Sequence, residues 1–386
     1  MSRIYLDNHQ ATQPSRASIK AMAPFLTELW GSPTAPHPMG EELLTAMTAA
    51  YDSIYDLLGA KATDSFIFTS SGAEAVNHVA LATYLDRIRG TGRNHLLTST
   101  LGEAPIILAY ERLEQLGCKT AMVAVNENGV ITLKALEEAI TPRTALLSLS
   151  WANALTGVIQ PVAELAELCR MRGIWFHLDA THILGKIPFD LDEIAPDLLS
   201  FSGEALHAPR GTGGLWIRSG LRLSPLILGG NEQDGQRGGP FSPALLAALG
   251  VAAREAKEAQ EGVTTETARL RDHLVSELLA IPRAHGFFQS AERLPTTAVL
   301  SFPGVVSDAL LYTLAREGVL ASFGGGSYQN LSLQLEASGV PSLLANCAIA
   351  LTLSRFTTED EVRRAVEIIT RSVSRLRFYS QALIPT

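Results

Sequence analysis

Cysteine is scarce in this chain of 386 residues: Cys118, Cys169 and Cys347 are the only three, and they lie far apart. None of the spacings is that of a metal site, so each is expected to be a reduced core residue. Lysine is also scarce, most basic residues are arginine, and no run of basic residues occurs. Together with a net charge of −8, this argues against nucleic acid or an anionic membrane as a partner.

Long apolar segments are missing as well. The longest, such as residues 343–353, are too short to span a bilayer. The N-terminus begins on a strand-like pattern rather than on a basic segment followed by an apolar one, so no signal peptide is expected. We therefore expect a cytoplasmic protein. With 46% hydrophobic residues, a chain of this length can bury one large core or two unequal ones.

Strand-like and helix-like segments alternate through much of the chain. Short apolar runs predict strands at residues 66–69, 96–99, 121–125, 145–150, 175–179, 198–201 and 214–217, and each of the first four precedes a segment with helical apolar spacing. This alternation predicts an α/β fold with a mostly parallel, two-sided sheet. An alanine-rich helical stretch at 241–261, extending to about 279, is expected to lead into a smaller domain.

A small-residue turn follows the first of these strands. Residues 70–73 read Ser-Ser-Gly-Ala and precede a helix predicted to begin at Glu74. Small residues before a helix leave backbone N–H groups open to an anion. The same residues also suit a tight strand-to-helix turn without a ligand, and both interpretations stay open.

Motifs along nearly the whole chain resemble those of the NifS-like cysteine desulfurases, a group of the class V aminotransferases. They are YLDN at 5–8, the turn at 68–77, Asn153 with GVIQ at 157–160, HLDAT at 177–181, SGEALHAPRG at 202–211, the glycine-rich segment 229–239 and SRFTTE at 354–359. The resemblance implies a fold type I transferase that depends on pyridoxal phosphate, with a large α/β domain at residues 13–257. Residues 1–12 and 258–386 would form a smaller α+β domain. A homodimer is also implied, because active sites in the family borrow residues from the other subunit.

The position that carries the cofactor lysine in this family is Ala205, and the preceding histidine is Glu204. A methyl group cannot form a Schiff base, so covalent binding of pyridoxal phosphate is not expected. Asp179, which would pair with the pyridine nitrogen, and Ser202, which would contact the phosphate, are retained. By resemblance, the cofactor-contacting positions are Asp179, Ser202, Ala73, His182, Asn153 and Glu204.

Most other working positions of the family have changed. The stacking histidine falls at Glu103, the phosphate-turn threonine at Ala73, the asparagine near the phenolic oxygen at Ala154, the glutamine at His182, the intersubunit threonine at Pro240 and the substrate-binding arginine at Ala350. The catalytic cysteine would lie near Ser327, in a loop at 322–327 that contains no cysteine. Groups that would hold an anionic cofactor have thus become alanine, proline or glutamate.

Several interpretations of function follow. We favour a non-catalytic paralogue that binds a protein partner, such as an active desulfurase or an iron–sulfur assembly protein. The alternatives are an enzyme that uses pyridoxal phosphate non-covalently and an ordinary desulfurase with an engineered lysine-to-alanine change at position 205. A further alternative is an acidic pocket in which Glu103, Asp179, His182 and Glu204 bind a metal.

Overall fold

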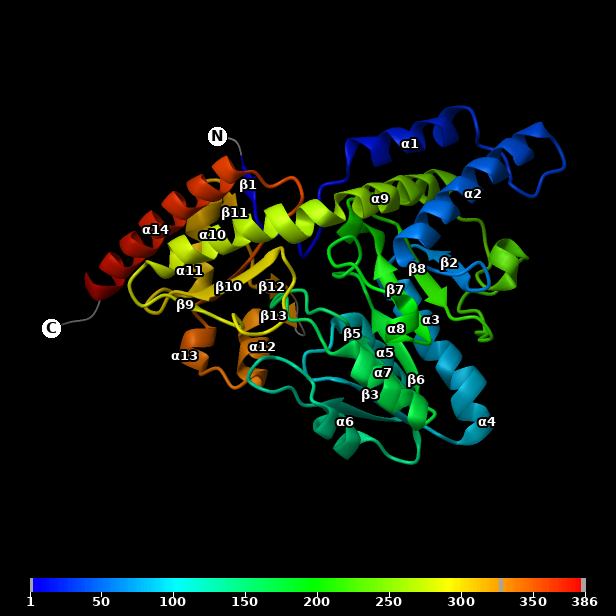
Figure 1. The fold of residues 1–386 in the computed structure, drawn as a ribbon, viewed down its shortest axis with the longest axis horizontal. Coiled ribbons are helices and arrows are strands. Elements are labelled where there is room, and N and C mark those ends of the chain that lie inside the picture. The colour runs from blue at the N-terminus through cyan, green and yellow to red at the C-terminus, as the bar shows by residue number, and fades with distance from the viewer. Residues whose placement is uncertain (1–2, 326–328, 383–386) are drawn as a thin grey trace.

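A seven-stranded sheet forms the centre of the larger part of the molecule in the computed structural model, which describes residues 3–325 and 329–382 (Figure 1). In spatial order its strands are β2 (Ser65–Thr69), β8 (Gly213–Ile217), β7 (Leu198–Ser202), β6 (Trp175–Asp179), β5 (Thr144–Ser150), β3 (His95–Ser99) and β4 (Lys119–Val123). Only β8 is antiparallel to its neighbours. The mostly parallel α/β sheet expected from the sequence is confirmed.

Helices cover both faces of this sheet. One face packs against α3 (Gly72–Ala82) and α5 (Ala104–Glu114), and the other packs against α2 (Pro38–Leu58), α7 (Val162–Met171) and α9 (Pro243–Gly262). Shorter helices are α6 (Leu133–Ala139) and α8 (Leu191–Ile194), while α1 (Arg16–Thr27) lies along α9. Strands buried on both faces need continuous apolar runs, and this is why β5 is buried at every position.

The smaller part has its own sheet, in which β10 (Thr297–Ser301) is antiparallel to β14 (Ala348–Thr352) and to β9 (His285–Gly286). The helices α10 (Ala268–Leu279), α11 (Ser307–Arg316) and α14 (Glu359–Ala382) share a core with it, together with β1 (Ile4–Tyr5) and β11 (Val319–Leu320). Further short elements are β12 (Gly324–Gly325), β13 (Gln329–Asn330), α12 (Leu331–Ala337) and α13 (Ser342–Ala345).

One helical rod passes from the large core to the small one (Figure 1). It consists of α9, a π-helical segment (Val263–Thr267) and α10, which agrees with the helicity expected as far as residue 279. The proposed domain boundary after residue 257 falls inside this rod and stays a proposal. Within the described ranges, no helix has both the length and the apolar character needed to cross a membrane. The cytoplasmic location stays a prediction.

Two boundaries differ from the sequence expectations. The strand expected at 121–125 is β4 at Lys119–Val123. Val125 does not pair with β3 and instead forms a bridge with Ile131, across a turn held by the side chain of Asn126. The helix expected to begin at Glu74 begins at Gly72. Ser71 ends the extended segment there, since its hydroxyl accepts a hydrogen bond from the Glu74 N–H at 3.1 Å and caps the helix.

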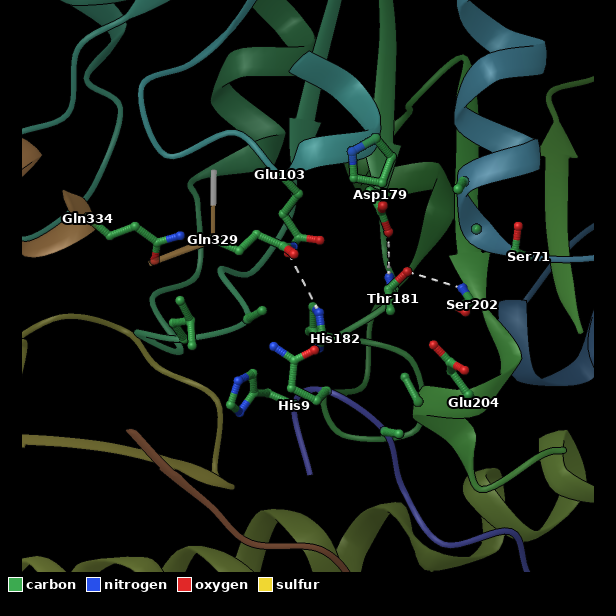
Figure 2. Close-up of a pocket in the computed structure, with 18 residues that line it drawn as sticks. His9, Ser71, Glu103, Asp179, Thr181, His182, Ser202, Glu204, Gln329 and Gln334 are labelled. Atoms are coloured by element: carbon green, nitrogen blue, oxygen red, sulfur yellow. Dashed lines mark hydrogen bonds and ion pairs between the residues drawn. The ribbon is translucent and has the colours of Figure 1, made fainter. Parts of the chain in front are cut away.

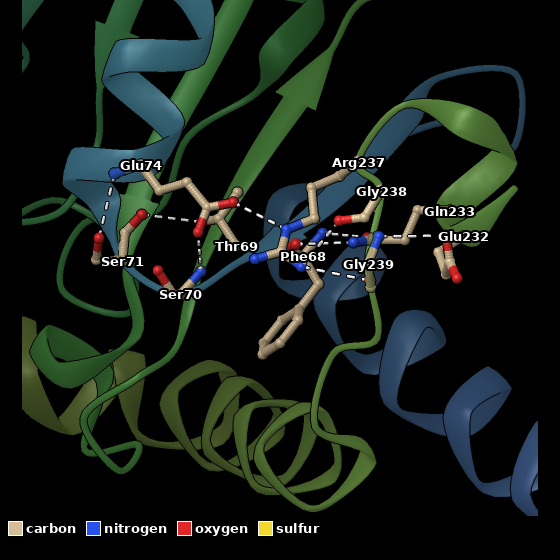
Figure 3. Close-up of polar contacts among 10 residues, drawn as sticks. All are labelled: Phe68, Thr69, Ser70, Ser71, Glu74, Glu232, Gln233, Arg237, Gly238 and Gly239. Atoms are coloured by element: carbon tan, nitrogen blue, oxygen red, sulfur yellow. Dashed lines mark hydrogen bonds and ion pairs between the residues drawn. The ribbon is translucent and has the colours of Figure 1, made fainter. Parts of the chain in front are cut away.

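A loop at residues 229–239 closes the free edge of β2 (Figure 3). The Gln233 side chain accepts a hydrogen bond from the Phe68 N–H at 2.7 Å and donates one to the Phe68 carbonyl at 2.9 Å. It therefore takes the place of a neighbouring strand. Gln233 itself has a left-handed backbone, with φ of 49°.

Replacing Gln233 with alanine should lower the free energy of unfolding by about 1–3 kcal/mol, because both backbone groups of Phe68 lose their partners. Urea denaturation of the variant measures this loss. Gln236→Ala, a change of the same residue type in the same loop, is the matched control and should be close to neutral. Equal losses in the two variants would show that the paired hydrogen bonds add nothing.

Candidate ligand-binding site

A cavity of about 220 Å³ lies where β6 and β7 end and α3 begins (Figure 2). Segments distant in sequence complete its wall: residues 9–11 on one side, and residues 329 and 334 on another. Its polar lining consists of His9, Gln10, Ser71, Glu103, Asp179, Thr181, His182, Ser202, Glu204, Gln329 and Gln334. The carboxyl ends of parallel strands are where α/β proteins place their ligands, so this cavity is the candidate site.

Asp179, Thr181 and Ser202 form a short hydrogen-bonded chain on the floor of the cavity. The Asp179 carboxylate accepts a hydrogen bond from the Thr181 N–H at 2.9 Å, and the Thr181 hydroxyl accepts one from the Ser202 N–H at 3.0 Å. These bonds hold the ends of β6 and β7 together. Burial raises the pKa of Asp179, although its hydrogen bonds to Thr181 oppose the shift.

Glu103 is buried at the N-cap position of α5 and does not cap that helix. Its Oε1 atom lies 3.6 Å from Nε2 of His182 and has no hydrogen-bond partner. Burial, followed by the charge of Asp179, raises the pKa of Glu103 to about 8. Burial also lowers the pKa of His182 well below its usual value. Near neutral pH the site therefore holds a largely protonated Glu103 beside a neutral His182.

His9 enters the cavity from the N-terminal segment with a defined ring orientation. Its Nδ1 lies 3.3 Å from Oδ1 of Asp7 and 3.4 Å from the Thr352 hydroxyl. Burial lowers the pKa of His9 to about 4, so the ring is neutral. The charge of the nearby Asp7 carboxylate favours the tautomer with the proton on Nδ1, and in that tautomer Nε2 is an acceptor. That Nε2 atom is buried and has no partner.

Ala205 lies on the short 3₁₀ turn (Gly203–Leu206) after β7 and is 8% exposed. It lines the main cavity and also a smaller one behind it, where Lys186 is found. Lys186 does not line the main cavity. The side chain of Glu204, beside Ala205, is 33% exposed, and its Oε2 atom lies 3.5 Å from Nε of Arg210.

Most of the positions predicted from the sequence meet in this cavity: Ala73, Glu103, Ala154, Asp179, His182, Ser202, Glu204 and Ala205. Asn153 does not line it. Its side-chain oxygen instead accepts hydrogen bonds from the N–H groups of Leu155 and Thr156 and holds that turn. Ala350 is fully buried in β14, and Pro240 is exposed. Ser327, the predicted cysteine position, lies outside the described residues.

The lining residues that were not predicted include four polar ones: His9, Gln10, Gln329 and Gln334. The first two come from the N-terminal segment and the other two from the C-terminal third of the chain. The signal available for His9 was its place directly after YLDN at residues 5–8. We found no such signal for the three glutamines.

The arrangement gives no support to the metal hypothesis. In the part of the chain that the structure describes, no three His, Cys, Asp or Glu side chains come close enough together to hold a metal ion. Glu103 and His182 are neighbours, but Asp179 is engaged by Thr181 and Glu204 lies toward Arg210. A closed set of donors is what a protein metal site requires.

The fold and the position of the cavity are those of fold type I, the fold of the pyridoxal phosphate-dependent transferases. The chain belongs to the family described as Aminotransferase class-V, which matches residues 4–364. A solved structure named NifS-like protein superimposes with a TM-score of 0.90 and is 28% identical, covering 97% of this chain and 100% of its own. DndA from Streptomyces lividans superimposes with a TM-score of 0.76 at 27% identity, covering 89% of this chain and 97% of that one.

The curated relatives are cysteine desulfurases. Cysteine desulfurase 2 of Trichormus variabilis is 36% identical over 385 residues, covering 98% of this chain and 95% of the relative. Cysteine desulfurase NifS of Azotobacter vinelandii is 34% identical over 383 residues, covering 98% of this chain and 94% of the relative. The NifS-like resemblance drawn from the motifs is thereby confirmed.

Pyridoxal phosphate, the cofactor of the family, does not fit the residues of this cavity. Among its described lining residues none is Lys or Arg, whereas Glu103, Asp179 and Glu204 each carry a carboxyl group. A phosphate dianion would find no Lys or Arg side chain among these lining residues to compensate its charge. Ala205 offers no amine for covalent attachment.

Proposed function

We propose that this chain is a cysteine desulfurase homologue that has lost the sulfur-releasing reaction and acts by binding. The observation that carries the proposal is the cavity lining: three carboxyl groups, no Lys or Arg among the described residues, and Ala205 at the family's lysine position. The reaction of the family begins on a cofactor held by lysine, and this cavity supplies neither the amine nor a cationic environment.

The proposal includes a homodimer and a protein partner. The dimer follows from family membership, and the partner would be an active desulfurase or an iron–sulfur assembly protein. A scaffold that keeps its fold while its site changes is consistent with selection for binding. Chemical cross-linking of the purified protein tests the dimer.

Non-covalent use of pyridoxal phosphate is the second candidate, and the retained Asp179 and Ser202 favour it. It differs from the first in one observable. A protein that holds the cofactor without lysine keeps an absorbance band after desalting, but borohydride does not fix that band to the chain. The first proposal expects no retained band.

Incubation with pyridoxal phosphate and cysteine should therefore release no sulfide and leave the protein colourless. We expect the same of Ala205→Lys, because the restored amine would still face Glu103, Asp179 and Glu204. The visible absorbance of the desalted protein, borohydride reduction and sulfide release measure the outcome. Sulfide release by the native chain would refute the proposal. Sulfide release by Ala205→Lys alone would favour a desulfurase disabled by that one change.

A further inference from the structure

We propose that the cavity binds a small organic cation rich in N–H donors, a primary amine or guanidine of about amino-acid size. The inference rests on the proposed function, because pyridoxal phosphate and this ligand would occupy the same cavity. It identifies the chemical class of ligand at the site of Glu103, His9 and Gln334.

Three buried acceptor atoms in the wall of this cavity have no partner. They are Oε1 of Glu103, Nε2 of His9 and Oε1 of Gln334. Their residues are 7%, 8% and 4% exposed, so each is more than nine-tenths buried. A buried polar atom without a partner destabilises the folded protein, because it has lost its hydrogen bonds to water. Three of them around one cavity indicate a ligand that satisfies them together.

The chemistry of these atoms specifies what the ligand carries. The Gln334 amide oxygen can only accept hydrogen bonds, and Glu103 accepts them at both oxygens once a cation beside it has displaced its proton. Nε2 of His9 accepts in the tautomer that places the ring proton on Nδ1, 3.3 Å from Oδ1 of Asp7. All three therefore require donors. Phosphate and carboxylate ligands bring acceptors and would leave them unsatisfied.

Charge points to the same class of ligand. The carboxyl groups of Asp179 and Glu204 line the cavity together with that of Glu103, whose proton a bound cation would displace, and the two imidazoles, His9 and His182, are neutral. An ammonium or guanidinium group offers positive charge and several N–H donors at once, and charge-assisted hydrogen bonds are the stronger kind. A bare metal ion is less suitable, since no three donors in the described chain converge on one point.

Figure 2 shows the arrangement that such a ligand would meet. Glu103 and His182 point toward each other from opposite walls, and His9 and Gln334 lie on neighbouring sides. A planar guanidinium presents donors in several directions in one plane, which suits acceptors placed around a cavity. The volume of about 220 Å³ admits a ligand of about amino-acid size.

Calorimetric titration of the full-length protein with methylguanidinium tests the proposal, with methylurea as its uncharged isostere. Propylammonium and 1-propanol form a second matched pair. We expect each cation to bind about tenfold or more tightly than its neutral counterpart. Glu103→Gln should weaken cation binding by about tenfold. Glu164→Gln, an exposed change on α7, is the control and should leave binding unchanged.

Circular dichroism melting first establishes that Glu103→Gln is folded, and Gln334→Met serves as an independent second variant with a smaller expected loss. Equal binding of methylguanidinium and methylurea would overturn the inference. So would the absence of binding by both cations, which would mean that water alone satisfies the three atoms. In either case the proposed function stands if pyridoxal phosphate is also not retained. Release of sulfide from cysteine would overturn the proposed function instead.

Discussion

Replacing Glu103 with glutamine should stabilise the protein, by an amount that grows with pH. Glu103 is buried beside Asp179, and burial raises its pKa to about 8. In the unfolded chain the same carboxyl has its usual pKa of 4.5. The folded state thus holds a proton that the unfolded state releases.

The sign of the effect follows from this difference. The contribution of Glu103 to stability is fully present below about pH 4.5 and is lost as pH rises through about 8. At still higher pH the loss is on the order of 5 kcal/mol. Burial also raises the pKa of Asp179, so Asp179 affects stability in the same direction. Glutamine carries no titrating proton, so the substitution removes the pH-dependent loss of stability that Glu103 causes.

Urea denaturation of the native protein and of Glu103→Gln at about pH 5, 7 and 9 measures the difference. The two free energies of unfolding should be similar at the lowest pH and diverge at the highest. Glu164→Gln, which removes an exposed carboxylate, should follow the native curve. Parallel curves for Glu103→Gln and the native protein would mean that Glu103 is ionised in the folded state at neutral pH.

Arg237→Met should lower the free energy of unfolding by about 3–5 kcal/mol, since it leaves the Glu74 carboxylate buried without its cation. The guanidinium Nε lies 3.0 Å from Oε1 of Glu74, and both side chains are largely buried (Figure 3). The other Glu74 oxygen accepts a hydrogen bond from the Ser70 N–H at 2.8 Å. This pair therefore ties the loop at 229–239 to the beginning of α3.

The expected loss depends on pH. Burial raises the pKa of Glu74, but hydrogen bonds from Arg237 and Ser70 outweigh it and leave the pKa lowered. Stability from this pair is present above the unfolded pKa and is lost as pH falls through the folded one. Arg222→Met, an exposed arginine, is the control. Glu74→Gln combined with Arg237→Met should recover part of the loss, and failure to recover any would assign the effect to packing.

Much of the fold could be predicted from the sequence because its strands are short apolar runs between turn residues. The runs at 145–150 and 175–179 became β5 and β6 almost unchanged. The end of β4 could not be predicted, since the bridge from Val125 to Ile131 depends on a side chain of Asn126. The π-helical segments at Thr83–Ile88 and Val263–Thr267 were also missed, because apolar spacing does not distinguish them from α-helix.

The candidate site could be predicted only where it follows motifs. Asp179, Ser202 and Glu204 lie at the ends of adjacent strands, so strand order alone brings them together. His9 and Gln334 reach the same cavity through the packing of β1 and α12, which sequence patterns do not specify. Asn153 was assigned to the cofactor because the motif was retained, whereas its side-chain oxygen holds its own turn and its amide nitrogen donates to the Leu101 carbonyl.

The Gln233 side chain also determines what the sheet can recruit. An uncovered outer strand presents its backbone groups to any extended peptide and is a common starting point for aggregation. At β2 the amide of Gln233 already occupies the N–H and the carbonyl of Phe68. Another molecule would have to displace it before adding a strand there. At the opposite edge of the sheet, the exposed Lys119 at the start of β4 places a charge that discourages pairing with a strand of another molecule.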